Sequence, residues 1–169
     1  MLYMVEMELP DRSRLADWHD WYVNHIRKLL TLDGYHASQR FEAITPRAAP
    51  FLAIHDVVGP ELFEGTGYRT VGGPSGTGEW RDVMTNWSRN LFEGCDAMPD
   101  IGRDERLALV DDPSKLPVAF GERVTWLHSI GLDRNIPQRG FIMLAAGEDH
   151  AALAAAGVDI FRPISEKLR

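Results

Sequence analysis

The stretch Leu2-Tyr3-Met4-Val5-Glu6-Met7-Glu8-Leu9 opens the chain with an alternating pattern. One side carries only apolar residues, at positions 3, 5, 7 and 9, and the other side carries the two glutamates together with Leu2 and Met4. Successive side chains of a strand point to opposite faces, so this alternation predicts a β-strand with apolar residues on both faces. Pro10 ends the strand, and Asp11 is a suitable N-cap for a following helix.

Residues 12–31 predict an amphipathic helix. At about 100° per residue, its apolar positions fall on one arc, which contains Leu15, Trp18, Tyr22, Ile26 and Leu29. His25 and Trp21 lie at one shoulder of this arc. Gly34 follows the helix, as glycine often does at a helix C-terminus.

The rest of the first half predicts strands over residues 35–44 and 51–58, joined by a turn with two prolines. A flexible glycine-rich loop is expected over residues 72–78. A second helix is expected over residues 79–92, because Trp80, Val83, Met84, Trp87 and Leu91 have helical spacing. This β-α-β-β-α order, closed by a later strand, is typical of a ferredoxin-like α+β fold.

The domain expected is a single one over residues 1–169, with a ferredoxin-like core over residues 1–92. Residues 93–122 are rich in Asp, Gly and Pro and predict an irregular surface segment. Residues 123–169 predict a C-terminal extension of two strands, a short helix and a last strand. The helices would cover one sheet face and leave the face of Leu2 and Met4 open, which favours a homodimer that closes a barrel.

Composition and charge exclude several classes of protein. The chain has 169 residues, with 18 basic and 25 acidic side chains and a net charge of −7, and without a basic cluster it is a poor match for nucleic acid. No run of about 18 apolar residues predicts a membrane span, and the first residues do not resemble a signal peptide. Cys95 is the single cysteine, so no internal disulfide is expected, and we expect a reducing, cytoplasmic environment.

The segment Asp17-Trp18-His19-Asp20-Trp21-Tyr22-Val23-Asn24-His25, followed by Gly34-Tyr35, resembles the first-helix signature of the EthD-like dimeric α+β barrel family. Phe51-Leu52-Ala53-Ile54 before Gly59-Pro60-Glu61 is similar to the third strand of the same group, and the resemblance covers residues 1–92. It implies a dimeric barrel and a range of activities: cyclases, dehydratases, isomerases and cofactor-free oxygenases acting on aromatic or polyketide-like compounds. Asn24 stands where many relatives have Glu, which puts that residue's role in doubt.

His25 is the leading catalytic candidate, because burial beside Trp18 and Trp21 would keep its imidazole neutral and able to act as a base or a hydrogen-bond donor. Tyr22 or Asn24 would then be its hydrogen-bonding partner. The alternative is a structural histidine bonded to a backbone carbonyl.

The expected substrate-binding residues line a pocket between the sheet and the helices, and they include Trp18 and Trp21 of the first helix. His55 lies in an apolar strand and must be paired or face a cavity. Arg40 and Arg69 are candidate anchors for a substrate, although Arg40 also suits an ion pair between strands. Tyr68 and Arg69 precede the glycine-rich loop, so they would line a pocket mouth that the loop covers as a lid.

No metal or cofactor is expected. His19 and His25 are six residues apart, which does not match the spacing of two ligands on one helix, and no histidine is singled out as a haem ligand. The sequence therefore favours a cofactor-independent enzyme that moves protons on a small aromatic or polyketide-like compound. The alternative is a non-catalytic protein that binds a small ligand or assists a catabolic pathway.

Overall fold

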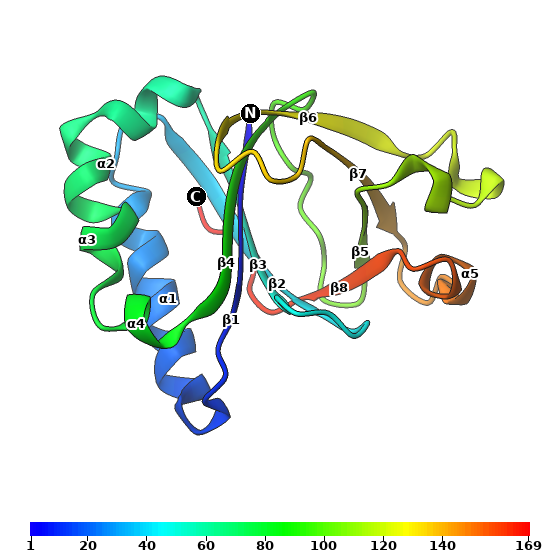
Figure 1. The fold of residues 1–169 in the computed structure, drawn as a ribbon, viewed down its shortest axis with the longest axis horizontal. Helices are drawn as coiled ribbons and strands as arrows, with labels where there is room; N and C mark the ends of the chain where they lie inside the picture. Colours follow the sequence, from blue (N-terminus) through cyan, green and yellow to red (C-terminus); the bar gives the residue numbers. More distant parts are fainter.

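The computed structural model describes the backbone of residues 1–169 and the side chains of residues 1–73 and 76–169. The first half of the chain places one long helix and three short helices between four strands (Figure 1). Its elements are β1 (Leu2–Glu8), η1 (Arg12–Arg14), α1 (Leu15–Leu29), β2 (Tyr35–Ala43), β3 (Phe51–Val57), η2 (Pro60–Glu64), α2 (Thr66–Val71), α3 (Gly73–Thr77), α4 (Trp80–Val83) and β4 (Thr85–Glu93).

The second half repeats the plan with less helix. Its elements are β5 (Arg106–Val110), η3 (Pro113–Lys115), η4 (Val118–Phe120), β6 (Thr125–Leu132), β7 (Gln138–Leu144), α5 (Ala151–Ala155) and β8 (Asp159–Pro163). A strand therefore lies at residues 106–110, inside the segment expected to be irregular. The alternation that marks a half-buried strand is absent there, because Leu107, Ala108, Leu109 and Val110 are all buried.

The eight strands form a closed antiparallel barrel in the order β1-β3-β2-β8-β5-β7-β6-β4. Each half contributes four adjacent strands in the same internal order, β4-β1-β3-β2 and β8-β5-β7-β6. The halves join at two equivalent places, β2 with β8 and β4 with β6. The barrel is thus built from two similar units that meet about an approximate twofold axis.

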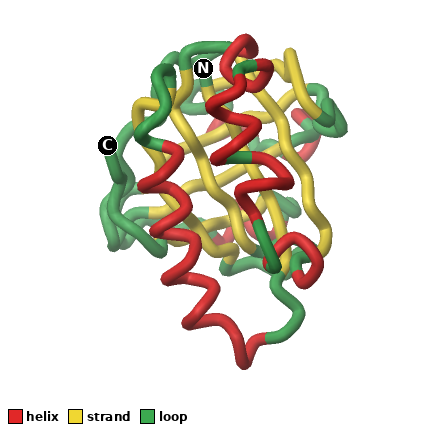
Figure 2. The backbone as a smooth tube through the Cα atoms, turned by 90° about the vertical axis from the view of Figure 1, so that its left-hand side faces the viewer, coloured by secondary structure: helices red, strands yellow, loops and turns green.

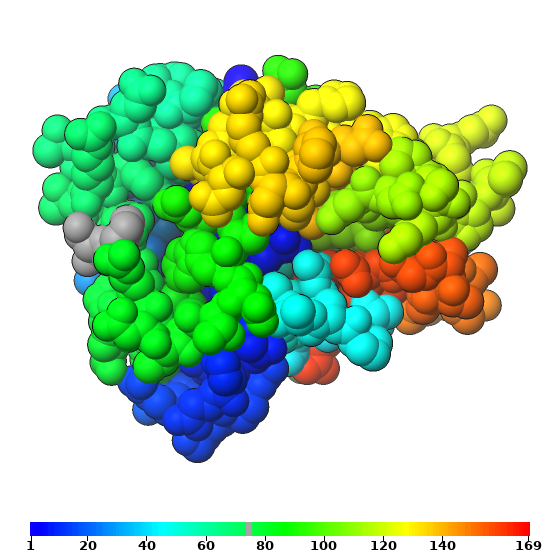
Figure 3. Space-filling model, viewed as in Figure 1, coloured from blue at the N-terminus to red at the C-terminus, as the bar shows by residue number. Residues whose placement is uncertain are grey.

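The barrel closes within one chain, so the open sheet face that favoured a homodimer does not exist. Leu2 and Met4 do face away from the helices, but they pack against Leu107, Leu127 and Phe161 of the second half. The space-filling view shows the yellow-to-red second half directly against the green β4 and the cyan β2 region (Figure 3). The face that was expected to be open is therefore covered by the chain's own strands, and a homodimer stays an untested prediction.

The expected helix over residues 79–92 is also wrong. Only residues 80–83 are helical, and β4 follows from Thr85. Trp87 and Leu91 satisfy the spacing of a strand as well as that of a helix, and pairing with both β1 and β6 decides between the two.

The glycine-rich stretch at residues 72–78 forms α3 rather than the expected flexible loop. A Cβ atom on Gly72 would lie 2.5 Å from the Tyr68 ring, and one on Gly76 would overlap the Val71 carbonyl. The glycines here permit close packing of consecutive turns.

Helices α1 to α4 lie together on the outer face of β1 to β4, as the side view shows (Figure 2). A hydrophobic core lies between them and contains Val5, Trp18, Ile26 and Phe51. A separate core fills the barrel interior. Of the described helices, none is long and apolar enough to cross a membrane.

A buried ion network also joins the two halves. The Arg139 guanidinium, 1% exposed, lies 3.2 Å from Glu6 Oε1 of β1 and 2.7 Å from Asp111 Oδ1. Arg47 Nη2 lies 2.6 Å from the same Glu6 oxygen. Strand β1 therefore buries Glu6 inside the barrel, where two arginines compensate its charge.

Candidate functional site: a cavity between the helices and the sheet

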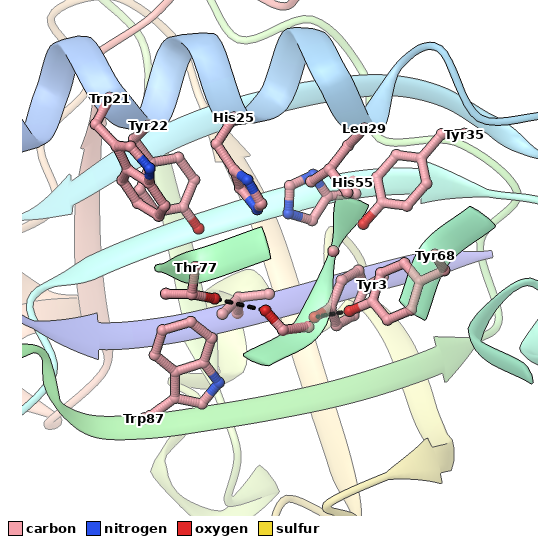
Figure 4. Close-up of a pocket in the computed structure, with 13 residues that line it drawn as sticks. Tyr3, Trp21, Tyr22, His25, Leu29, Tyr35, His55, Tyr68, Thr77 and Trp87 are labelled. Atoms are coloured by element: carbon pink, nitrogen blue, oxygen red, sulfur yellow. Dashed lines mark hydrogen bonds between the residues drawn. The ribbon is translucent and has the colours of Figure 1, made fainter. Parts of the chain in front are cut away.

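One cavity lies between α1, the short helices and the outer face of the first half of the barrel (Figure 4). It is lined by Tyr3, Val5, Trp21, Tyr22, His25, Leu29, Tyr35, His55, Tyr68, Gly72, Gly73, Thr77 and Trp87. The space free of atoms in and around it is about 370 Å³, of which about 20 Å³ can hold the centre of a water molecule. This cavity, which we call the inner cavity, therefore holds about one or two water molecules.

His25 reaches the cavity from the middle of α1. Its ring stacks on Trp21, with centroids 5.0 Å apart and planes 12° apart. Burial and the charge of Lys28 lower the pKa of His25 to about 4, so the imidazole is neutral at physiological pH. No hydrogen bond joins the His25 ring to another residue among those the structure describes. The alternative of a structural histidine held by a backbone carbonyl therefore has no support in this geometry.

His55 reaches the same cavity from β3 on the opposite wall. Its Nδ1 lies 2.6 Å from Ser38 Oγ on β2, and its ring stacks on Tyr3. Burial, with the nearby His25, lowers the pKa of His55 to about 3. In the tautomer in which Nδ1 accepts the Ser38 hydroxyl proton, the Nε2–H is free to donate. The site thus holds two neutral imidazoles.

Four tyrosines line the cavity, and the hydroxyls of Tyr3, Tyr35 and Tyr68 lie at its end beside His55. The hydroxyl oxygens of Tyr3 and Tyr68 are 3.1 Å apart and share a hydrogen bond. The Tyr35 hydroxyl is buried and has no partner among the described residues. It points into the space beside His55 in Figure 4. Burial raises the pKa of Tyr35 well above its usual value, so the group keeps its proton and remains an unused donor.

A β-bulge places Tyr35 in the cavity. Tyr35 pairs with Val57 and Ala37 with Asp56, so one extra residue lies in β2 between these pairs. The extra residue shifts the alternation, and Tyr35 joins Ser38 on the helix-covered face instead of the barrel interior. Simple alternation along residues 35–44 assigns Tyr35 to the opposite side from Ser38, and this is why Tyr35 was missed as a site residue.

A second hollow lies directly beside the cavity and shares Gly73, Thr77 and Trp87 with it. We call it the vestibule, and it is lined by Gly73, Thr77, Arg81, Met84, Trp87, Arg89 and Asp133. About 290 Å³ of it can hold the centre of a water molecule, which is enough for a small ring compound. The vestibule is therefore the roomier part of the site.

Five of the residues expected at the site line the cavity. They are Trp21, Tyr22, His25, His55 and Tyr68. The cavity also contains Tyr3, Tyr35, Thr77 and Trp87, which sequence reasoning did not assign to a site. The strand identity of residues 85–93 brings Trp87 there. Tyr3 lies on the expected helix-facing side of β1, so its alternation pattern was a usable signal.

Four expected residues do not line the cavity, and three of them are Trp18, Asn24 and Arg69. Trp18 is buried in the core, where its Nε1 donates to Met84 Sδ at 3.3 Å. Asn24 is exposed on the outer side of α1 and accepts a hydrogen bond from Arg27. Arg69 is exposed on α2. Each side chain points away from the cavity, so none can act there in this structure.

Arg40 is buried rather than poised to hold a substrate. Its guanidinium stacks on Tyr22 at 4.2 Å and on Trp18 at 4.7 Å. It also hydrogen-bonds the ring and the carbonyl oxygen of His19. Burial lowers the pKa of Arg40 to about 10. The arginine therefore fastens α1 to β2 through cation–π contacts, and it is neither an anchor in the cavity nor part of an ion pair between strands.

The donor groups around the cavity were compared with those that a metal ion or a haem needs, for the described part of the chain. No group of three or more His, Cys, Asp or Glu among the described residues is placed to hold a metal ion. His25 and His55 share a cavity that holds one or two waters, and a porphyrin is far larger than this space. The histidines therefore do not fit a haem group in this arrangement.

No family model matches the sequence, and no curated protein matches it. Solved structures with a similar fold include the following two. An anthrone oxidase-like protein gives a TM-score of 0.58 at 10% identity, covering 99% of this chain and 92% of its own. A chlorite dismutase-like protein gives a TM-score of 0.54 at 8% identity, covering 97% of this chain and 95% of its own. These likenesses show the fold alone, a mixed α+β protein with a closed antiparallel barrel.

Proposed function

We propose that this protein is a cofactor-independent enzyme that moves a proton on a small ring compound bearing a carbonyl or phenolic oxygen. The observation that carries the proposal is the unpartnered Tyr35 hydroxyl, buried at a cavity that also holds two neutral imidazoles. An unsatisfied buried donor is costly for the fold, so it is typical of a site that a ligand completes. The anthrone oxidase-like neighbour favours a ring ketone as a first compound to test.

Tyr35, His55 and His25 have different roles in the proposed proton transfer. The Tyr35 hydroxyl donates a hydrogen bond to the substrate oxygen, and His55 Nε2–H is a second donor. His25 takes a proton from a ring carbon conjugated with the carbonyl, which in anthrone is the CH2 across the central ring. The C–H electron pair passes through the ring to the carbonyl oxygen, and the resulting enolate oxygen faces both donors. Isomerisation follows when the proton is delivered to the enolate oxygen, which gives the hydroxy tautomer of the ring ketone and leaves His25 neutral again. The ring lies mainly in the vestibule, because the inner cavity has room only for its reacting edge.

The low pKa of His25 has a direct kinetic consequence. His25 accepts a proton only in its neutral form, which predominates above about pH 4. If His25 is the base, kcat/KM stays flat from about pH 5 to pH 8 and falls below about pH 4. The imidazolium forms beside the new enolate, so the developing negative charge stabilises it where solvent does not.

A non-catalytic ligand-binding protein is the second candidate. No carboxylate forms an ion pair with His25 or His55 among the described residues. Asn24, which replaces the Glu of EthD-like relatives, points to solvent. A histidine without a carboxylate partner is a weak base, and this favours binding without turnover.

The isomerisation of anthrone to its hydroxy tautomer, followed by absorbance, distinguishes the enzyme from the binding protein. For an enzyme we expect His25→Gln and Tyr35→Phe to lower kcat/KM by about 100-fold or more. His128→Gln is the matched control, because His128 is exposed on β6 in the other half. Saturable binding of anthrone without turnover would support the binding protein. Unchanged turnover in both cavity variants would contradict the proposed mechanism.

The finer family assignment belongs to this proposal. We propose that each half of the barrel is a ferredoxin-like unit, since both halves have the same strand order. We also propose that the first half is EthD-like, on the evidence of its Trp-rich first helix and the placement of Trp21, Tyr22 and His25 at the cavity.

A further inference from the structure

We infer that the vestibule is a carboxylate subsite, so that the ligand is a ring-bearing acid with a polar oxygen at the end opposite its carboxylate. This inference rests on the proposed function of the inner cavity and adds the chemical class of the compound. The carboxylate pairs with Arg89 and Arg81, the ring lies along Trp87, and the distal oxygen reaches Tyr35 and the two histidines.

Arg89 lies at the boundary between the two hollows. It is on β4 and pairs with Val5 of β1, which lines the inner cavity, so both side chains rise on the helix-covered face. Its guanidinium is close enough to Tyr3 to lower the pKa of that buried hydroxyl, against the larger effect of burial. Arg89 is therefore a cation beside the aromatic cavity, and its side chain remains 28% exposed to solvent through the vestibule.

The charges of the vestibule do not balance. Two arginines, Arg81 and Arg89, line it with a single carboxylate, Asp133. Asp133 Oδ1 lies 3.3 Å from Arg89 Nη2, and Asp133 Oδ2 accepts the Arg89 backbone N–H at 2.9 Å. The backbone bond holds Asp133 in place, and the longer side-chain contact leaves guanidinium donors for a ligand. The remaining positive charge favours an anion.

The walls of the vestibule suit a flat ring. Met84 and Trp87 supply an adaptable thioether and an indole face. Trp87 lines the inner cavity as well, so a ring lying along it spans both hollows. A carboxylate at one end and an oxygen at the other therefore match the two polar regions that the indole separates.

The test compares 6-hydroxy-2-naphthoate with its carboxamide and with 2-naphthol, using tryptophan fluorescence to measure Kd. We expect the acid to bind at least about tenfold more tightly than the amide in the unaltered protein. Arg89→Met should remove this advantage. Asp133→Asn should tighten binding of the acid alone, since Asp133 competes for Arg89. Arg69→Met, on an exposed arginine outside both hollows, should change nothing.

The outcomes separate this inference from the proposed function. Equal affinity for the acid and the amide, with 2-naphthol binding lost in Tyr35→Phe, overturns the carboxylate subsite and leaves the inner cavity intact. An acid preference that Arg89→Met and Asp133→Asn leave unchanged also overturns it. If none of the three compounds binds, the proposed function fails, and this inference fails with it. Opposite shifts in the Arg89 and Asp133 variants support it.

Discussion

Tyr3 and Tyr68 hydrogen-bond to each other through hydroxyl oxygens 3.1 Å apart, while another tyrosine of the same cavity, Tyr35, has a buried hydroxyl without a partner among the described residues. The first pair contributes to stability as an ordinary buried hydrogen bond. The unsatisfied Tyr35 hydroxyl lowers the stability of the folded protein until a ligand or a water molecule hydrogen-bonds to it. The two kinds of tyrosine therefore respond oppositely to the same substitution.

Tyr35→Phe should stabilise the empty protein by up to about 1 kcal/mol, because it removes an unsatisfied buried polar group. Tyr3→Phe is the matched control and should cost about 1 kcal/mol, because it breaks the bond to Tyr68. Urea unfolding measures both free energies. A loss of stability in Tyr35→Phe equal to that in Tyr3→Phe would show that the Tyr35 hydroxyl has a partner in solution.

Stability should fall as the pH is lowered from 6.5 towards 4. The pKa of His25 is about 4 in the folded protein, against 6.5 for the ordinary group. The unfolded chain therefore binds the proton first, and protonation favours unfolding by up to about 3 kcal/mol over this interval. His25→Gln should reduce the difference in unfolding free energy between pH 7 and pH 4.5. His128→Gln should leave it unchanged, and a flat profile in the unaltered protein would contradict the burial of His25.

Glu6→Gln should destabilise the barrel by about 3–5 kcal/mol. The substitution removes the carboxylate that compensates Arg139 and Arg47, whose side chains are 1% and 15% exposed. Glu8→Gln is the control, because Glu8 pairs with the half-exposed Arg12 and should cost less than about 1 kcal/mol. Thermal unfolding of both variants tests the difference, and equal midpoints would contradict the buried network.

A chain ending at residue 94 should not stay a soluble monomer. It would expose the inner barrel face, which includes Leu2, Met4, Phe41 and Phe92, to water. We expect this fragment to aggregate or to self-associate, with its mass measured by light scattering. A stable, folded monomer of residues 1–94 would contradict the importance of closure by the second half.

Much of the first half could be predicted from its pattern. β1, α1, β2 and β3 occupy the expected places, because each has a clear period and a Gly or Pro boundary. The shoulder position of His25 on α1 correctly places its ring beside Trp21. Long-range strand pairing determines β4, which the local pattern does not. Trp87 fits both a helical and a strand period, and only the pairing of β4 with β1 and β6 makes it a strand residue.

The less predictable parts of the site depend on small backbone features. A one-residue bulge moves Tyr35 to the cavity, and the sequence carries no strong mark of that bulge. Arg40 reads as an exposed strand residue, yet Trp18 and Tyr22 of α1 cover it. Barrel closure within one chain was missed because the strand over residues 106–110 has no polar alternation.

The most direct test of the central claim is nitrogen NMR of the histidine rings during titration with 2-naphthol. The structure implies neutral His25 and His55 rings at pH 6, facing one shared space. We expect the ligand to shift the ring nitrogen signals of both residues together, with the signals of exposed His128 unchanged. Saturable binding that leaves both cavity histidines unshifted, or charged imidazoles at pH 6, would contradict the account.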